Sequence, residues 1–443
     1  MRRSARHEMV NYQKHIDTLV HRLSATLEGL PFDGIAFHSG QLHYYFADDI
    51  YAPFHSNPHF AHWVPLAGPG HLVVARPEQK PKLIALIPED YWYEPVTFES
   101  PFWIDSFDFV QVSSQEEFQA ELGSVNGLAF IGESCEVARE LQFSDNAVTD
   151  ELLTARLNWD RTIKTDYEVD CIDEAAKLAA KAHRAAREAF ESGGSEIEIH
   201  HAYVIAIGCI DAELPYESII ALNEKGSYLH YVNKRTERDG KVLLIDSGAA
   251  VNGYASDITR TWTSKSAAPV FQEMRDAFDN LERNLCEQVQ RGLNFIELHE
   301  TAHREIGKFL STFGVLKVSG DEAFDRGLTH PFFPHGLGHD LGIQVHDIAG
   351  RQANRDGGTI DPPEHYPFLR NTRVLQPGNV VTIEPGCYFI EMLLRPFRSN
   401  SDSSAFNWEL IDQLSSHGGI RTEDDILVTA NGNRNLTRPY LPE

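Results

Sequence analysis

Apolar runs separated by turn-forming residues predict short strands in the second half of the chain. Residues 241–249 (KVLLIDSGA) are rich in Val, Leu and Ile and predict a buried strand. Residues 254–262 (YASDITRTW) predict a second strand. Between them lies Asn252-Gly253, the kind of dipeptide that most strongly indicates a two-residue hairpin turn. We therefore expect the two segments to pair as an antiparallel hairpin.

This hairpin would place two aspartates on one face. With that turn, the register sets Asp246 opposite Thr259 and Asp257 opposite Gly248. Cross-strand partners share a face, because side chains alternate along a strand. The two aspartates are then diagonal neighbours, about 7–8 Å apart at the backbone, so their carboxylates can converge. Gly248 leaves room for a site between them.

Helical spacing of apolar residues predicts long helices around this hairpin. A helix over about 166–192 begins with a capping box formed by Thr165 and Glu168. Further helices are expected near 268–291 and 296–313.

The first part of the chain has a different pattern. The segments HLVVARP, KLIALIP and LAFIGES predict strands, with amphipathic helices between them, which is typical of an α/β domain. A boundary is expected near 156–165. We predict an N-terminal α/β domain over residues 1–160 and a second domain over residues 161–443.

Composition and charge exclude one class of function. The 443 residues, 42% of them hydrophobic, are enough for two or three domains' worth of core. The net charge of −26 arises from 39 basic and 65 acidic residues, so the basic face that nucleic-acid binding requires is not expected. Most of the acidic excess should lie on a solvated surface.

The chain shows no pattern for export or for crossing a membrane. Its N-terminus, MRRSARHEMVNYQKHIDTL, starts basic but lacks the apolar stretch of a secretory signal. No window approaches the ~18–20 apolar residues that a membrane span requires. The five cysteines are scattered and show no CxxC spacing, which suits a reducing compartment. We expect a cytoplasmic protein.

Five residues in separate motifs indicate metal chemistry. They are Asp246 in LLIDSGA, Asp257 in YASDITR, His339 in HGLGHDLG, Glu384 in TIEPG and Glu423 in GGIRTED. Four carboxylates and one imidazole carry too much charge to be buried together unless cations lie among them. This oxygen-rich set suits two divalent ions and favours Mn²⁺, Co²⁺ or Mg²⁺ over Zn²⁺. Taken singly, each residue has an ordinary alternative, since a strand-end aspartate more often caps a turn.

These motifs resemble those of the pita-bread metallopeptidases, which include methionine aminopeptidase, aminopeptidase P, creatinase and prolidase. The resemblance spans roughly 161–443. Residues 330–350 (HPFFPHGLGHDLGIQVHDIAG) and 362–390 are most similar to the bacterial prolidase branch, which also includes the organophosphorus acid anhydrolases. Residues 37–60 resemble the same branch. The resemblance implies an α+β pita-bread catalytic domain, like that of creatinase and methionine aminopeptidase, after the α/β domain.

The resemblance also implies a role for each ligand. Asp246 would chelate one ion, Asp257 and Glu423 would bridge both ions, and His339 and Glu384 would complete the other. Two ions ~3.5–4 Å apart can share a water and lower its pKa, so that a bridging hydroxide attacks a carbonyl polarised by a metal. Glu384 would also pass the proton to the leaving nitrogen. Mn²⁺ is the expected metal, with Co²⁺ as the alternative.

Histidines around this centre are the next candidates. By resemblance, His230 and His346 would hydrogen-bond the substrate and the tetrahedral intermediate. His335 and Tyr216 are further candidates for substrate binding. Because the chain has 21 histidines, the ordinary alternative for His230, His335 and His346 is a purely structural role.

Two arginines and one aspartate bear on the substrate and the assembly. Arg370 and Arg421 match positions that bind the C-terminal carboxylate of a dipeptide in prolidases, and arginine offers the bidentate geometry for that contact. Asp49 matches an acid that in this branch reaches the neighbouring subunit's site; the alternative is a loop aspartate that caps a turn. The aromatic loop YYFADDIYAPFHSNPHFAHW around Asp49 suggests a homodimer interface.

Together these features predict a dinuclear metallopeptidase that cleaves Xaa-Pro dipeptides, with side activity on phosphotriesters. The alternatives are an Xaa-Pro aminopeptidase like aminopeptidase P and a non-enzymatic pita-bread binding module. The presence of all five ligands disfavours the binding module. The expected partners are small dipeptides and a second copy of the chain, with no nucleic acid and no membrane.

Overall fold

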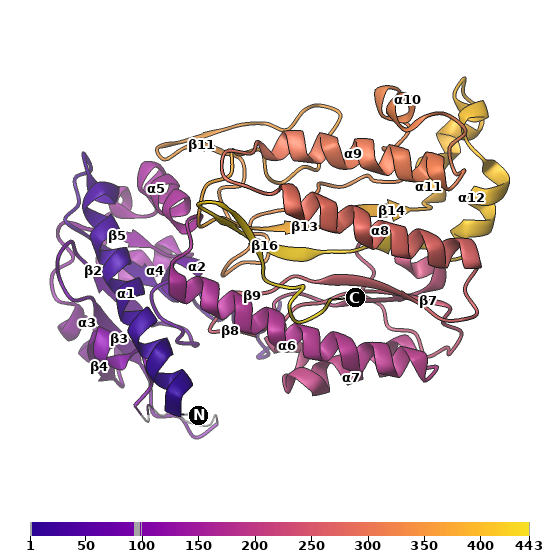
Figure 1. Cartoon of the computed structure of the whole chain (residues 1–443). Helices are drawn as coiled ribbons and strands as arrows, with labels where there is room; N and C mark the ends of the chain where they lie inside the picture. Colours follow the sequence, from indigo (N-terminus) through magenta and orange to yellow (C-terminus); the bar gives the residue numbers. More distant parts are fainter. Residues whose placement is uncertain (1, 93–97, 99, 443) are drawn as a thin grey trace. The chain divides into compact units, whose positions relative to one another are not determined.

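The chain divides into two units, which we describe separately. The computed structural model describes residues 2–92, 98 and 100–442. The first unit comprises Met1–Glu168 together with Asn354–Gly358, and the second comprises Val169–Ala353 and Thr359–Glu443. In Figure 1 the first unit is coloured mainly indigo to purple.

The first unit is built on a five-stranded mixed sheet with the order β4-β3-β2-β1-β5. Its strands are β1 Gly34–His38, β2 Leu72–Ala75, β3 Lys82–Leu86, β4 Asp108–Val112 and β5 Leu128–Ile131. Its helices are α1 Arg2–Leu27, α2 Pro58–Ala61, α3 Gln115–Leu122, α4 Cys135–Glu140 and α5 Glu151–Arg161. The expectation of an α/β class is confirmed.

The expected alternation of strands and helices is wrong at one place. β2 and β3 pair antiparallel, with Val73 opposite Leu83, and no helix separates them. The connecting residues 76–81 (RPEQKP) contain two prolines and four polar or charged residues, a composition that favours a short turn over a helix. Strands β1 and β4 were not predicted from the sequence.

A distant hairpin tip also belongs to the first unit. The hairpin is formed by β11 Gln352–Asn354 and β12 Gly357–Thr359. Arg355 Nη2 lies 2.8 Å from Asp160 Oδ2, and Arg156 Nε lies 2.7 Å from Asp356 Oδ1. The first unit therefore runs past the boundary expected at residue 160 and includes a short segment from far along the chain.

The second unit contains several small sheets, and isolated backbone bridges connect some of their strands to neighbouring segments. Its strands are β6 Ile219–Leu222, β7 Val242–Asp246, β8 Ala250–Val251, β9 Tyr254–Ala255, β10 Thr259–Thr263, β13 Val380–Ile383, β14 Gly386–Tyr388, β15 Gly419–Arg421, β16 Asp424–Thr429 and β17 Gly432–Asn435. The sheet orders are β10-β7-β6, β13-β16-β17, β14-β15 and β8-β9. Isolated bridges from Thr259 to Glu423 and from Asp340 to Val381 connect separate segments of this unit.

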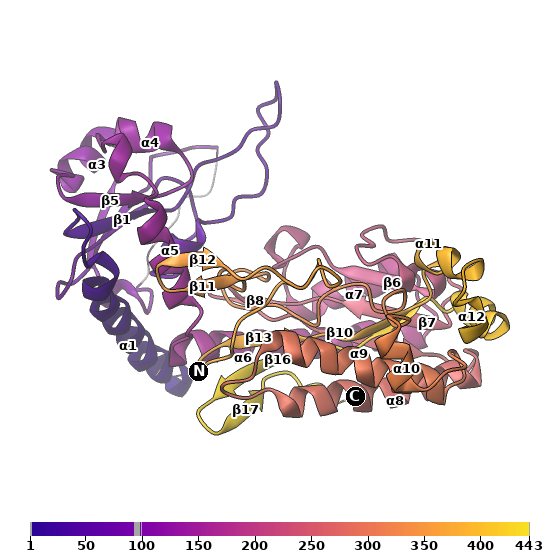
Figure 2. The same ribbon diagram turned by 90° about the horizontal axis from the view of Figure 1, so that it is seen from above.

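Helices pack against these strands through separate apolar cores. The helices are α6 Asp166–Glu191, which begins in the first unit, α7 Glu196–Ile207, α8 Pro269–Gln288, α9 Phe295–Thr312, α10 Gly320–Asp325, α11 Glu391–Leu394 and α12 Trp408–Ser415. Figures 1 and 2 show α8 and α9 side by side. Phe278 and Phe309 of these helices belong to one core with Val381 and Ile426, whereas Ile199 of α7 packs in another.

The predicted hairpin register is confirmed. Asp246 pairs with Thr259, and Ala250 pairs with Ala255. Asn252 and Gly253 have φ values of 51° and 87°, as a type I′ turn requires. Residues 247–249 and 256–258 lie outside the strands. The space beside Gly248 is filled by the chain itself, because a Cβ atom there would lie only 1.9 Å from the carbonyl oxygen of Ser256.

The predicted helices are confirmed as well. α6, α8 and α9 lie where helical spacing placed them. The N–H of Thr165 donates to Glu168 Oε2 at 2.8 Å, and the N–H of Glu168 donates to Thr165 Oγ1 at 3.5 Å, which are the two contacts of the expected capping box. Among the described helices, none combines the length and apolar character that crossing a bilayer would demand.

Two histidines on α9 are enclosed by aromatic rings. His299 and His303 are both 1% exposed. The His299 ring lies 4.4 Å from that of Tyr366 and 4.7 Å from that of His303, centroid to centroid. Burial, and to a smaller extent the neighbouring rings of His335, His330 and His365, lowers the pKa of His299 to about 3. The fold therefore holds His299 in its neutral form.

We expect this burial to make the protein sensitive to acid. An unfolded chain binds a proton at His299 below pH 6.5, whereas the folded chain does not, so stability falls as pH drops from 6.5 towards 3. Between pH 7.5 and pH 5.0 this one histidine should account for about 2 kcal/mol of lost stability. His299→Phe should recover most of that loss in denaturant melts at the two pH values, and the exposed His201→Gln should recover none. A His299→Phe protein with the wild-type pH dependence would contradict the assignment.

Candidate metal centre

The five acidic and imidazole residues come from five separate segments of the second unit. Asp246 ends β7, Asp257 lies between β9 and β10, and Glu384 follows β13. His339 lies in the loop after α10, and Glu423 lies between β15 and β16. The pairing of Thr259 with both Asp246 and Glu423 brings two of these segments together across β10.

The structure brings these side chains to one place. His339 Nε2 lies 3.3 Å from Asp257 Oδ2 and 3.5 Å from Glu384 Oε1. Asp257, His339 and Glu423 each offer a ligand atom within 4.8 Å of the other two. The hydroxyl of Tyr216 lies 2.9 Å from Asp246 Oδ1 and 2.5 Å from Asp257 Oδ1. All five residues therefore surround a single polar centre.

The centre holds more negative charge than its own cations can neutralise. Burial raises the pKa of Asp246 to about 6. The charge of Arg421 opposes this shift, and the charge of Asp257 adds to it. Burial and the neighbouring aspartates likewise raise the pKa of Glu384 to about 7, although His339 and Arg421 oppose the shift. The pKa of Glu423 is raised well above its usual value by burial and by Asp257. A divalent cation among these oxygens would restore their ionised forms, so the donor set fits a metal.

His339 responds in the opposite direction. Burial disfavours its charged form, but the hydrogen bond to Asp257 and the charge of Glu384 raise its pKa to about 9. Its Nδ1 atom lies 3.0 Å from the carbonyl oxygen of Asp340. Such a contact orients the ring and leaves Nε2 facing the carboxylates, which is the arrangement of an imidazole metal ligand.

Arg421 is engaged by the protein on all three guanidinium nitrogens. Nη2 lies 2.6 Å from Asp246 Oδ2, Nη1 donates to the hydroxyl of Tyr388 at 2.8 Å, and Nε donates to Thr259 Oγ1 at 3.1 Å. Thr259 Oγ1 in turn donates to Glu423 Oε2 at 2.6 Å. Arg421 and Glu423 therefore meet at the hydroxyl of Thr259, and Arg421 orients Asp246.

The remaining histidines lie around the centre. His335 Nε2 lies 2.9 Å from the hydroxyl of Tyr388, and His335 Nδ1 lies 3.8 Å from Glu384 Oε2. Burial and Arg421 lower the pKa of His335 to about 3, so it is neutral. The ring of His346 lies 4.5 Å from that of His339, and desolvation and the charge of His339 lower the pKa of His346 to about 4. His230 is exposed and close enough to lower the pKa of both rings.

Arg370 and Asp49 are both exposed but lie in different units. Arg370 lies close enough to His346 to lower the pKa of that ring. No hydrogen bond or ion pair joins its guanidinium to another described side chain. Asp49 lies in an exposed loop of the first unit, where Asp48 Oδ1 accepts from the N–H groups of Asp49 and Ile50. Asp48, and not Asp49, caps this turn.

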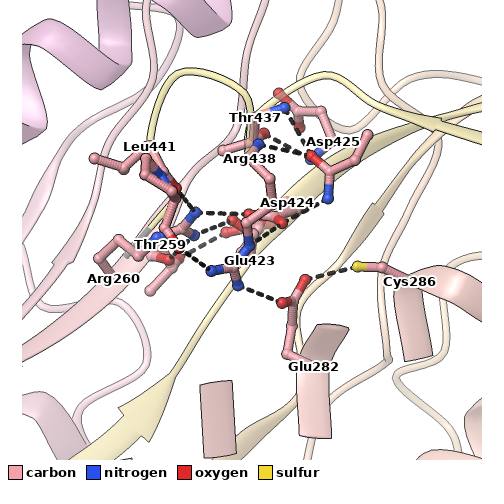
Figure 3. A network of polar contacts seen from close by, with 12 residues as sticks. Thr259, Arg260, Glu282, Cys286, Glu423, Asp424, Asp425, Thr437, Arg438 and Leu441 are labelled. Carbon is pink, nitrogen blue, oxygen red and sulfur yellow. Dashed lines mark hydrogen bonds and ion pairs between the residues drawn. The ribbon is translucent and has the colours of Figure 1, made fainter. Parts of the chain in front are cut away.

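A buried layer behind the ligands was missed by the sequence analysis. Arg260 is 2% exposed and donates to the carbonyl oxygen of Glu423 at 2.8 Å. It also donates to Asp424 Oδ1 at 2.8 Å and to the carbonyl oxygen of Leu441 at 3.0 Å. The carboxylate of Asp425 accepts the backbone N–H of Asp257 at 3.2 Å. These contacts hold the backbone of two candidate ligands in place, and Figure 3 shows the part of the layer around Arg260, Glu423 and Asp424.

Arg438 extends this layer. Its guanidinium contacts Asp424 Oδ2 at 2.6 Å, Asp279 Oδ1 at 2.8 Å and Glu282 Oε2 at 2.5 Å. Figure 3 shows Arg438 close to Asp424 and Glu282 close to Cys286. A signal was available in the sequence, because three consecutive acids at 423–425 open the apolar run ILVT and must find buried partners.

Comparisons with known proteins find relatives along nearly the whole chain. Residues 170–430 match the model of metallopeptidase family M24, and residues 10–159 match that of the Xaa-Pro dipeptidase N-terminal domain. Xaa-Pro dipeptidases of Shewanella amazonensis and Salmonella arizonae are each 39% identical over 432 residues, which is 96% of this chain and 97% of theirs.

Solved structures show the same fold. Aminopeptidase P from Escherichia coli with the inhibitor Pro-Leu has a TM-score of 0.73 at 22% identity, covering 97% of this chain and 95% of that one. Proline aminopeptidase P II from Yersinia pestis has a TM-score of 0.72 at 22% identity, with coverages of 97% and 96%. The expected pita-bread catalytic domain is confirmed. With its buried carboxylate and imidazole centre and these relatives over nearly its whole length, the chain belongs to metallopeptidase family M24.

Proposed function

We propose that this metallopeptidase hydrolyses Xaa-Pro dipeptides and releases C-terminal proline. The relatives that carry the name Xaa-Pro dipeptidase match 96% of the chain. The observation that carries the proposal is the exposed guanidinium of Arg370 close to His346, at the edge of the buried centre. A dipeptide ends in a carboxylate close to its scissile bond, and an arginine without a partner among the described residues is suited to bind it.

The five ligand residues are proposed to hold two divalent ions, Mn²⁺ or Co²⁺. The raised pKa values of Asp246 and Glu384 support a cation at this centre, because both carboxyls are buried beside other acids. The donor set of four carboxylates and one imidazole favours these metals over Zn²⁺. When bound, such ions lower the pKa of a water molecule and polarise a carbonyl group.

The protein's own side chains would then divide the remaining work. Arg370 binds the substrate carboxylate, while His230 and His346 offer ring nitrogens that hydrogen-bond the scissile amide. Glu384 lies close to neutral His335 and is the candidate to carry a proton to the leaving nitrogen. Arg421 is a positioning residue, because all its nitrogens hold protein groups, Asp246 among them. Tyr216 lies against the same aspartate and would line the substrate side.

Two further activities are considered beside the hydrolysis of Xaa-Pro dipeptides. An Xaa-Pro aminopeptidase would use the fold that the aminopeptidase P structures share, but it acts on longer peptides and needs no carboxylate anchor. Side activity on phosphotriesters is also proposed, because such a reaction proceeds by attack at a tetrahedral centre that the same site can accept.

A non-enzymatic role is disfavoured, since the ligand residues surround one centre.

We further propose that the working unit is a homodimer. Tyr44, Tyr45, Phe46 and Ile50 are 54% to 101% exposed, and all four lie in the loop that carries Asp49. Clustered exposed apolar side chains are costly in water and commonly lie in protein interfaces.

Activity should depend on divalent metal and on Asp257. Chelation should abolish hydrolysis of Ala-Pro, and Mn²⁺ should restore it best. Loss of a residue that only supports a ligand typically costs 10- to 100-fold, so Asp257→Asn should lower kcat/KM by more than about 100-fold while circular dichroism stays native. The exposed Asp276→Asn is the matched control. Full turnover in metal-free protein, verified by elemental analysis, would refute the metal assignment.

Arg370 should set the length of the substrate. Arg370→Gln should lower kcat/KM for Ala-Pro by roughly 10- to 150-fold, because it removes one charge-assisted contact of about 1.5–3 kcal/mol. Arg395→Gln, at another exposed arginine, should leave the rate unchanged. The wild-type enzyme should cleave Ala-Pro amide and Ala-Pro-Ala poorly. Equal rates on Ala-Pro and Ala-Pro-Ala would favour the aminopeptidase alternative.

Sedimentation at micromolar concentration should give a dimer, and Asp49 should act on the neighbouring site. Asp49→Ala homodimers and Asp257→Asn homodimers should both be weak, whereas exchange of subunits between them should recover one intact site per mixed dimer. As a control, two separate Asp257→Asn preparations are mixed in the same way, and no activity should be recovered. A monomer in solution, or a fully active Asp49→Ala protein, would count against this arrangement.

A further inference from the structure

A second group of metal-binding side chains lies inside the first unit. His15 is on α1, His62 directly follows α2, and Glu168 is in the first turn of α6. They are 1%, 8% and 2% exposed. Each offers a ligand atom, and these atoms lie within 4.8 Å of one another. This group is separate from the metal centre, whose ligands all belong to the second unit.

The spacing of the ligand atoms matches a tetrahedral ion. His62 Nε2 lies 3.3 Å from Glu168 Oε1, and His15 Nδ1 lies 3.8 Å from Glu168 Oε2. Zinc binds nitrogen and carboxylate oxygen at about 2.0–2.2 Å, so the edge of its coordination tetrahedron is about 3.3–3.6 Å. An ion placed here would draw the three ligand atoms, which lie within 4.8 Å of one another, to that spacing.

The hydrogen bonds leave the correct nitrogens for a metal. His15 Nε2 lies 2.7 Å from the carbonyl oxygen of His62, so Nε2 carries the proton and Nδ1 has the free electron pair. A carbonyl contact of this kind orients many metal-bound imidazoles. Nδ1 lies 2.8 Å from Thr165 Oγ1, a hydroxyl that can rotate away. His62 Nε2 is buried and makes no hydrogen bond to any described residue.

A second buried cluster in the protein differs in the partners of its side chains. Glu282, Cys286 and Asp424 also lie within ligand distance of one another. There, however, Arg438 contacts both carboxylates and Arg260 contacts Asp424, and the thiol of Cys286 donates to Glu282. The side chains of that cluster already have arginine or hydrogen-bond partners. His62 Nε2, in contrast, lies 3.3 Å from Glu168 Oε1 without forming a hydrogen bond within the described part of the chain.

We propose that His15, His62 and Glu168 bind one Zn²⁺ ion in the first unit. Two imidazoles and one carboxylate form a nitrogen-rich set, which favours Zn²⁺ over the Mn²⁺ expected at the oxygen-rich centre. A small cavity lined by Leu19, Arg22, Leu23 and Trp63 reaches His62 and offers a path for entry. The ion would join α1, the end of α2 and the start of α6, so its role is structural.

The test counts zinc in full-length variants. Metal-free protein would be dialysed against ZnCl₂, washed with buffer and analysed by mass spectrometry for zinc per chain. Glu168→Gln and His62→Gln should each bind one equivalent less than the wild type. Glu133→Gln should not differ from the wild type, because Glu133 and His43 form an exposed pair of the same chemistry in the same unit. An Asp257→Asn background should keep the same one-equivalent difference, which separates this site from the metal centre.

A second measurement covers variants that fold poorly. Zn²⁺ should raise the unfolding temperature of Asp257→Asn protein and should raise it less when His62→Gln is added, because only binding to the folded state stabilises. Equal zinc content in wild type, Glu168→Gln and His62→Gln would overturn the proposal. The same holds if Zn²⁺ shifts the unfolding temperature equally with and without His62→Gln, since the three residues would then form only a buried ion pair.

Discussion

The structure of the second unit depends on the burial of four carboxylates around an imidazole, which is unfavourable in free energy. Such groups repel one another and lose hydration, so the surrounding chain must hold them by other contacts. Arg421 and Tyr216 restrain Asp246, Thr259 restrains Glu423, and the backbone of Asp257 is held by Asp425. Strand β10 pairs with Asp246 and is bridged to Glu423. The same backbone pairing that joins the strands therefore also positions two residues of the centre.

Much of the local structure could be predicted from the sequence because local rules decide it. The Asn252-Gly253 turn fixes which residues face each other, and the side-chain period of two then carries Asp246 and Asp257 to one face. The capping contact between Thr165 and Glu168 sets the start of α6 in the same way. The five candidate ligands could be proposed because each lies in its own motif, and the structure brings them to one centre.

The rest depends on contacts between residues far apart in the chain. Arg421 was expected to face the substrate, yet its partners Asp246 and Tyr388 come from other segments, and no local pattern reveals them. The layer built by Arg260 and Arg438 likewise joins residues more than a hundred positions apart. The pairing of β2 with β3 was missed for a different reason, since apolar runs predict strands but not their order or direction.

The contribution of Asn354–Gly358 to the first unit bears on how the protein is made. A ribosome releases Asp160 long before Arg355, so the ion pair between them cannot exist while the first unit emerges. During that interval the carboxylate of Asp160 has only its closer neighbours, such as the hydroxyl of Thr26. The first unit is thus discontinuous in sequence, and its completion must wait for most of the second unit to be translated. Cutting the gene near codon 160 would not separate one self-contained piece from another.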